Sequence, residues 1–157
     1  MIRVKICGVT TIEDALLAAD LGASAIGIVL WPDSQRHVER AKAKEIVAAL
    51  PPFISAVGVF VNQVDEAEEI ARDIGLSAVQ FHGDEAPGTY RAFPIRVIKA
   101  VTVRDVSARE EAAAVPSTAT VQPCAIDVSS GVESRPGRKD PAKLRALFAA
   151  LETLKQT

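Results

Sequence analysis

The chain has 157 residues, of which 48% are hydrophobic and 24% are charged, and its formal net charge at pH 7 is −2. This composition is typical of one soluble globular domain spanning residues 1–157, with enough apolar residues for a sizeable core. The basic residues are scattered, and no apolar run reaches the roughly 18 residues of a membrane span, so we expect neither nucleic-acid binding nor membrane insertion. The strand-like N-terminus lacks a signal-peptide pattern, and we therefore expect a cytoplasmic protein.

The two cysteines, Cys7 and Cys124, are too few to indicate a disulfide framework. Cys7 ends one predicted strand and Cys124 begins another, which separates them by on the order of 10 Å if the strands are parallel. A disulfide needs Cα atoms within about 7 Å of each other. We therefore expect two free thiols, as in a reducing compartment.

The stretch from Arg3 to Thr10 predicts a buried strand that carries Cys7 to an edge. Apolar and basic residues alternate up to Cys7, and the pattern ends at Gly8. Thr10 and Glu13 have the spacing of a capping box, which predicts that a helix begins there. Cys7 therefore lies where a strand turns into a helix, which is the edge that carries ligands in parallel α/β proteins. From spacing alone, an inert buried thiol is the alternative interpretation.

Five more apolar runs predict strands, and helical patterns alternate with them. The predicted strands cover residues 25–31, 55–61, 77–82, 95–101 and the stretch from 124 into 133. The predicted helices cover residues 12–21, 41–50, 64–74, 106–115 and 141–154. This alternation predicts a parallel sheet with helices packed outside it and right-handed crossovers.

Polar residues lie at or after the carboxyl ends of three of these strands. Arg36 lies in the loop after the second strand, where an ordinary turn with a solvated arginine is the alternative interpretation. Gln80 and His82 point to the same side of their strand by its period of two, although a single histidine there is more often structural. The loop from Ser129 to Gly131 has small residues that let an anion approach the backbone closely.

Several segments in fixed order carry a family resemblance over nearly the whole chain. They are residues 5–8 (KICG), 27–36 (GIVLWPDSQR), 57–62 (VGVFVN), 79–83 (VQFHG) and 127–133 (DVSSGVE), followed by PG at 136–137 and KD at 139–140. Together they resemble phosphoribosylanthranilate isomerase, a (β/α)8 TIM-barrel enzyme of tryptophan biosynthesis. The resemblance implies an Amadori rearrangement of N-(5-phosphoribosyl)anthranilate to 1-(2-carboxyphenylamino)-1-deoxyribulose 5-phosphate, with no metal or organic cofactor.

The resemblance also implies roles for particular residues in this reaction. Cys7 is implied as the base, because the thiolate is the reactive form and a positive neighbour or a helix N-terminus lowers the pKa of a thiol. Arg36 is implied to hold the anthranilate carboxylate, which suits a planar guanidinium. Gln80 and His82 are implied to face the substrate.

Three further positions complete the implied site. Ser130 and Gly131 match part of the phosphate cradle. Asp127 is grouped with the substrate-binding positions, and it is also a conceivable substitute for the general acid. Asp84 and Glu85, which follow His82, are two other conceivable acids.

The chain departs from the family between the predicted helix near Glu110 and the strand at Cys124. The family places its sixth and seventh strands there, and we expect a gap or deletion near residues 116–119, which leaves six units of eight. The segment that is missing from this chain would hold the family's general acid, an aspartate at the end of the sixth strand. It would also hold half of the phosphate site. There are three explanations for the short segment: residues omitted from the sequence, an internal deletion, or a compact six-stranded variant.

Two other functions stay open at this point. A catalytically impaired barrel fragment would bind phosphosugars and self-associate through its open sheet edges. A different phosphosugar isomerase on the same fold is disfavoured by Cys7, because the related histidine-pathway barrel has an aspartate at that strand end. The expected partner is a small phosphosugar, and the expected assembly is a monomer or a homodimer.

Overall fold

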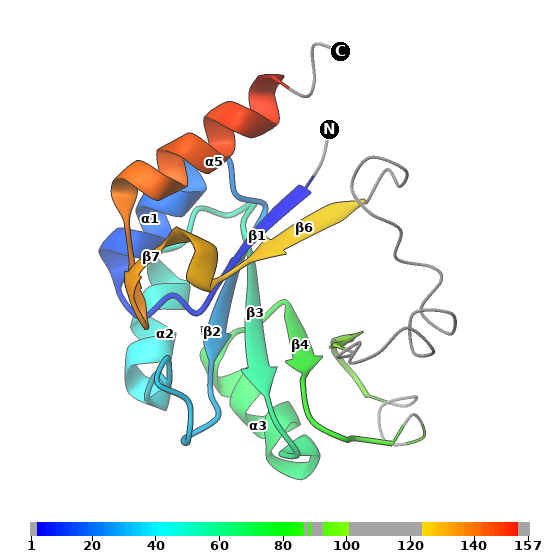
Figure 1. Ribbon diagram of the computed structural model, residues 1–157. Coiled ribbons are helices and arrows are strands. Elements are labelled where there is room, and N and C mark those ends of the chain that lie inside the picture. The colour runs from blue at the N-terminus through cyan, green and yellow to red at the C-terminus, as the bar shows by residue number, and fades with distance from the viewer. Residues whose placement is uncertain (1–2, 87, 89–92, 101–123, 154–157) are drawn as a thin grey trace.

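The structure is a computed structural model that describes residues 3–86, 88, 93–100 and 124–153, and its main feature is one sheet of parallel strands (Figure 1). The strands lie in the order β5-β4-β3-β2-β1-β6. Their bounds are β1 Arg3–Cys7, β2 Ala25–Val29, β3 Ser55–Phe60, β4 Ala78–Phe81, β5 Arg96–Lys99 and β6 Ala125–Val128. The expected α/β class with a parallel sheet is confirmed, and the six strands form an open half-barrel.

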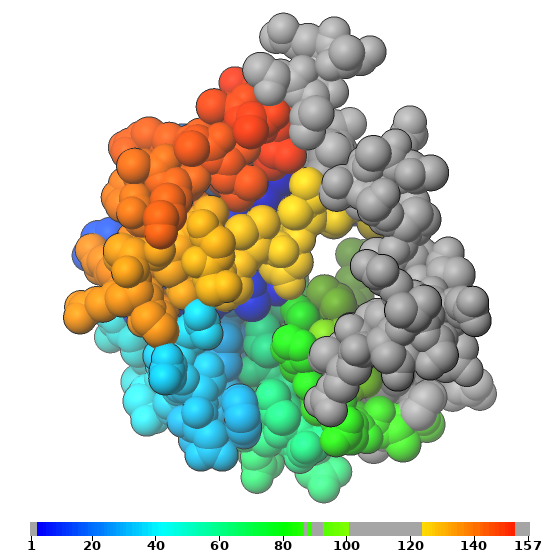
Figure 2. Space-filling model, viewed as in Figure 1, coloured from blue at the N-terminus to red at the C-terminus, as the bar shows by residue number. Residues whose placement is uncertain are grey.

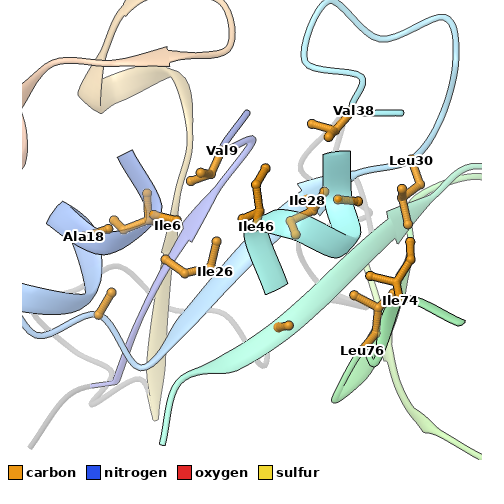
Figure 3. Packing of buried hydrophobic residues seen from close by; sticks show 14 of the residues in the cluster. Ile6, Val9, Ala18, Ile26, Ile28, Leu30, Val38, Ile46, Ile74 and Leu76 are labelled. Carbon is orange, nitrogen blue, oxygen red and sulfur yellow. The ribbon is translucent and has the colours of Figure 1, made fainter. Parts of the chain in front are cut away.

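Helices cover the outer face of this half-barrel. They are α1 (Ile12–Asp20), α2 (Arg40–Ala49), α3 (Val64–Ile74) and α5 (Pro141–Thr153), and neighbours pack in the order α5-α1-α2-α3. The helices contribute small buried residues such as Ala18, Ala43 and Ala71, which let them approach the sheet closely. The strands contribute larger side chains, among them Ile6, Ile26, Ile28 and Phe60 (Figure 3).

This core fixes the direction of the remaining side chains. Ile6 and Ile26 are fully buried on the helix side. Burying one such side chain contributes about 1.5–3 kcal/mol, so the strands cannot turn over without a large loss of stability. Because neighbours along a strand point to opposite faces, Cys7 and Gly27 face the inside of the half-barrel.

The first helix begins one residue later than its capping pattern predicts. The N-cap is Thr11, whose Oγ1 accepts a hydrogen bond from the backbone N–H of Asp14 at 3.2 Å. Thr10 is engaged elsewhere, because its hydroxyl donates to the carbonyl of Gly137. The expected capping box of Thr10 and Glu13 is therefore wrong, although the helix itself is confirmed.

The C-terminal part contains a hairpin that the sequence patterns do not predict. After β6 the chain forms the short 3-10 helix η2 (Ser130–Val132) and then two antiparallel strands, β7 (Glu133–Arg135) and β8 (Arg138–Lys139). Gly137, at a φ of 78°, makes the turn between them. The predicted helix over 106–115 and the predicted joint near 116–119 lie outside the described residues.

The two outer strands of the sheet, β5 and β6, are not paired to each other. Figure 2 shows the molecule hollowed between β6 and β4. Cys7 is partly buried and Cys124 is exposed, and both are free thiols, as expected. None of the helices in the described ranges is long and apolar enough to cross a membrane.

Candidate active site

A cavity of about 460 Å³ lies at the carboxyl ends of the parallel strands. It is lined by Cys7, Val29, Trp31, Ser34, Arg36, Val59, Val61, Gln80, His82, Asp127 and Ser129. Five of these, from four separate segments, are site residues that the sequence predicts: Cys7, Arg36, Gln80, His82 and Asp127. Because carboxyl ends of parallel strands meet at one edge, residues far apart in the sequence converge there.

A larger cavity of about 710 Å³ lies at the opposite end of the sheet. Its lining includes Arg3, Ser24, Ser55 and Arg96 but none of the predicted site residues. Volume alone would favour it as a binding site. We assign the chemistry to the smaller cavity because it combines a thiol, an imidazole and a guanidinium.

Cys7 occupies the last position of β1, directly beside Gly27 of β2. The backbone N–H groups of Gly8 and Val9 both donate to the carbonyl of Gly27, at 2.9 and 3.1 Å, and so fix the turn after the cysteine. A Cβ at position 27 would lie 2.7 Å from the sulfur of Cys7. The bare glycine therefore makes the space that the thiol occupies.

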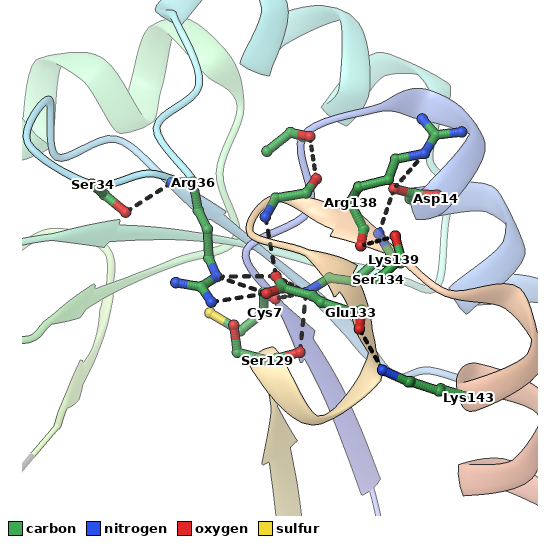
Figure 4. A network of polar contacts seen from close by, with 12 residues as sticks. Cys7, Asp14, Ser34, Arg36, Ser129, Glu133, Ser134, Arg138, Lys139 and Lys143 are labelled. Carbon is green, nitrogen blue, oxygen red and sulfur yellow. Dashed lines mark hydrogen bonds and ion pairs between the residues drawn. The ribbon is translucent and has the colours of Figure 1, made fainter.

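Arg36 reaches the same cavity from the loop after β2. This loop is tied back to the sheet, because His37 forms a bridge to Val29 and the backbone N–H of Arg36 donates to the hydroxyl of Ser34 at 3.1 Å. The guanidinium pairs with the carboxylate of Glu133, with Nη2 2.8 Å from Oε2 (Figure 4). These hydrogen bonds raise the pKa of Arg36 above its ordinary value.

Gln80 and His82 lie on the inner side of the sheet at the end of β4, which confirms the predicted alternation. The side-chain Oε1 of Gln80 is buried and has no hydrogen-bond partner within the described ranges. A buried oxygen without a partner costs about 1–3 kcal/mol. This oxygen is therefore available to accept a hydrogen bond from a bound ligand. His82 is fixed through its backbone, whose N–H donates to the carbonyl of Phe60 at 2.9 Å.

Asp127 and the serine loop form the wall on the β6 side. Lys5 and Asp127 are partners in the register of β1 and β6, and their side chains form an ion pair of 2.8 Å. Ser129 lines the cavity, whereas the predicted Ser130 and Gly131 lie next to it in η2 and are not part of the lining.

Asp84 and Glu85 lie outside the lining of the cavity. The carboxylate of Glu85 ties together the loops after β3 and β4, because it accepts hydrogen bonds from the backbone N–H groups of Asn62 and Gly83. Lys99 of β5 adds an ion pair of 2.7 Å. Burial raises the pKa of Glu85, but these hydrogen bonds outweigh it and leave the pKa below its ordinary value.

Two charged residues beneath the cavity, Glu133 and Lys139, were not among the predicted site residues. Both are almost completely buried, with residue exposures of 6% and 1%, and their side chains pair at 2.8 Å. Their only signal in the sequence was membership in the DVSSGVE and KD segments, because period and spacing do not reveal burial in a hairpin. The pair connects the arginine loop to the end of β1.

Comparison of this chain with known proteins identifies its relatives. The family model of N-(5'-phosphoribosyl)anthranilate (PRA) isomerase matches residues 4–120. The isomerase of Geobacter metallireducens is 38% identical over 194 residues, covering 92% of this chain and 96% of the relative. This aligned length exceeds the 157 residues of the chain, so the relative carries residues that this chain lacks.

Solved structures give the same result. The phosphoribosyl anthranilate isomerase of Thermotoga maritima matches with a TM-score of 0.89 and 32% identity, covering 98% of this chain and 100% of that one. An isomerase in complex with reduced 1-(o-carboxyphenylamino)-1-deoxyribulose 5-phosphate matches with a TM-score of 0.89 and 34% identity, with the same coverage. A further structure concerns mutually generated monomers of the Thermotoga protein, which it describes as dimeric. The half-barrel is therefore of the TIM-barrel type.

Proposed function

Because this chain belongs to the N-(5'-phosphoribosyl)anthranilate isomerase family, we propose that Cys7 and Arg36 are its principal catalytic and substrate-binding residues. The protein is an isomerase of tryptophan biosynthesis that converts N-(5-phosphoribosyl)anthranilate to 1-(2-carboxyphenylamino)-1-deoxyribulose 5-phosphate. The chemistry of this substrate determines what the site must supply. An acid protonates the ring oxygen as the ribose opens, and a base then removes the proton from C2′.

The thiolate of Cys7 is the proposed base. It takes the C2′ proton from the opened, N-protonated imine. The electron pair of the C–H bond forms the C1′–C2′ double bond of an enolamine, and the C=N π pair moves onto the nitrogen and neutralises its charge. Tautomerisation of the enol then gives the aminoketone product. The position of the sulfur at the end of β1, with the open Gly27 beside it, supports this role.

The other lining residues are proposed to bind the substrate. The guanidinium of Arg36 suits the anthranilate carboxylate, and the unpartnered Oε1 of Gln80 suits a donor such as an amine or a hydroxyl. His82 and Asp127 complete the polar wall around the ribose. The small residues Ser130 and Gly131 are proposed to expose backbone N–H groups to the phosphate.

The single observation that carries this proposal is the convergence of Cys7 and Arg36 in one cavity. Replacing Cys7 by Ser removes the thiolate while keeping its size, so kcat should fall by about 10²–10⁴-fold. Binding of the reduced product should change little, because the variant keeps the binding groups. Fluorescence-monitored turnover measures the first effect and calorimetry the second.

The matched control for this experiment is Cys124→Ser. Cys124 is an exposed free thiol outside the cavity, so this change should leave kcat unaltered. Normal turnover by the Cys7→Ser variant would refute the proposed base.

We also propose a homodimer in the cytoplasm. Phe53 lines the larger cavity and is 95% exposed, so a second copy that covered it would remove apolar surface from water. The dimeric Thermotoga relative supports the assembly, which light scattering measures. Two free thiols support the reducing compartment.

A second candidate function is phosphosugar binding without efficient turnover, with self-association through the open edges of β5 and β6. The length of the aligned relatives favours it, because the resemblance places the general acid in the segment that this chain lacks. Turnover separates this candidate from the first.

A further inference from the structure

Arg36 is held by a buried carboxylate rather than left free to move. The carboxylate of Glu133 accepts from Nε at 3.0 and 3.2 Å and from Nη2 at 2.8 Å, which is a two-pronged pairing. Its side chain is only 4% exposed, whereas that of Arg36 is 26% exposed at the cavity. Glu133 thus binds the guanidinium from the protein side, and the rest of the guanidinium lies at the cavity.

This pairing determines which edge of the guanidinium remains available. The group has five N–H bonds, and Glu133 engages the one on Nε and one on Nη2. The three that remain, on Nη1 and Nη2, have no acceptor within the described ranges. They form the edge that can bind a second carboxylate through two parallel hydrogen bonds.

The aliphatic part of Arg36 is also confined. Gly8 lies beneath it with a φ of 73°, and a Cβ there would lie 2.5 Å from Cδ of the arginine. The backbone N–H of Arg36 is fixed by Ser34. The loop, the stem and the head group are therefore each restrained by a different contact.

Lys139 connects this arrangement to the end of β1. Its side chain is fully buried, and Nζ donates to the carbonyl oxygens of Cys7 and Ser129 and to Oε1 of Glu133 (Figure 4). The three acceptors match the three N–H bonds of an ammonium group. One buried ion pair thus supports both the loop that carries Arg36 and the backbone of Cys7.

We propose that Glu133, supported by Lys139, is the positioning residue that presents the Nη1–Nη2 edge of Arg36 to the anthranilate carboxylate. This inference rests on the proposed role of Arg36. A positioning role makes a specific prediction, because the carboxylate of the substrate is remote from the reacting C2′ atom. Loss of Glu133 should weaken binding in the ground state and the transition state alike, and so should raise KM more than it lowers kcat.

The test compares Glu133→Gln with Arg36→Ala and with the double variant. Glu133→Gln should raise KM, and Kd for the reduced product, by about 10- to 100-fold, the usual cost of losing a charged hydrogen-bond partner. In the Arg36→Ala background the same change should shift Kd by less than about 2-fold, since the residue through which it acts is gone. Both values are measured on folded protein, which circular dichroism verifies.

Asp14→Asn is the matched control. Asp14 is a buried carboxylate that accepts from the backbone N–H of Lys139 at 3.0 Å, so it supports the same hairpin without touching Arg36. It should lower the free energy of unfolding with KM nearly unchanged.

Three results would overturn the inference. One is a tighter or unaltered Kd in Glu133→Gln, as expected if the glutamate merely neutralises the arginine. Another is an equal effect of Glu133→Gln with and without Arg36. The third is normal binding of the reduced product by Arg36→Ala, which would refute the proposed function of Arg36 itself. Weak binding by Arg36→Ala together with normal binding by Glu133→Gln would refute only the positioning role of Glu133.

Discussion

At the scale of single residues, the space around Cys7 depends on Gly27. A Cβ at that position would lie 2.7 Å from the sulfur and 3.0 Å from the Cα of Cys7, and the second contact is with backbone that cannot yield easily. Gly27→Ala should therefore displace the thiol, lower kcat at least 10-fold and reduce the free energy of unfolding by about 1–3 kcal/mol. Turnover assays and urea unfolding measure the two effects.

Gly88→Ala provides the control for this substitution. Within the described part of the chain, and apart from the two neighbouring residues, no atom lies within 4 Å of the Cβ that it would add, so both kcat and stability should stay near those of the unaltered chain. Equal behaviour of the two alanine variants would show that Gly27 does not define the position of the thiol.

Whether a residue's position in the site could be predicted depends on whether local sequence pattern or distant contacts determine that position. Cys7, Gln80 and His82 could be placed from the sequence because a strand has a strict period of two and its core face is apolar. Glu133 could not be placed, because its burial results from a hairpin and from an arginine 97 positions away in the chain. The N-cap is Thr11 and not the predicted Thr10 for a similar reason, because the hydroxyl of Thr10 donates to the carbonyl of the distant Gly137.

At the scale of elements, Glu133 couples the β7–β8 hairpin to pH. Burial raises the pKa of its carboxyl, but the hydrogen bonds and charges of Arg36 and Lys139 outweigh burial and lower the pKa to about 2. Burial also lowers the pKa of Lys139, although Glu133 opposes this shift. Because the pKa of Glu133 is depressed in the folded state, its stabilising contribution is complete above its ordinary value near 4.5 and is lost as the pH falls toward 2.

The expected result is a pH-dependent difference between the natural chain and Glu133→Gln. Their free energies of unfolding should differ most at neutral pH, and the difference should shrink by up to about 3 kcal/mol between pH 5 and pH 2. Urea unfolding at several pH values measures it. A difference that stays constant over this interval would show that the carboxylate is not ion-paired in the folded protein.

Most elements could be predicted because their signals are local. Helix α3 has the predicted bounds, Val64–Ile74, since acidic residues begin it and Gly75 ends it with a φ of 81°. The β7–β8 hairpin has no such signal. Its strands have three and two residues, too few to show alternation, and its stability comes from tertiary contacts such as the hydrogen bond from the Lys139 backbone to Asp14.

At the scale of the whole molecule, the half-barrel keeps the edge of the sheet that carries Cys7, Arg36, Gln80 and His82. It does so because β1 to β4 are consecutive neighbours, and each is anchored by its own helix or by the next strand. The alternation of elements in the sequence could predict a parallel sheet with helices packed outside it. It could not predict how β5 and β6 end the sheet, because pairing at an edge depends on strands elsewhere in the chain.

The half-barrel is proposed to isomerise N-(5-phosphoribosyl)anthranilate with Cys7 as the base. The most direct test is turnover by purified protein whose intact mass is 16.6 kDa, beside the Geobacter metallireducens relative and the Cys7→Ser variant. We predict turnover with a kcat about 10²–10⁴-fold below that of the relative, because the general acid is expected in the segment that this chain lacks beside that relative. We also predict that Cys7→Ser abolishes this turnover. Absence of turnover in a chain that still binds the reduced product, or turnover that survives Cys7→Ser, would contradict the claim.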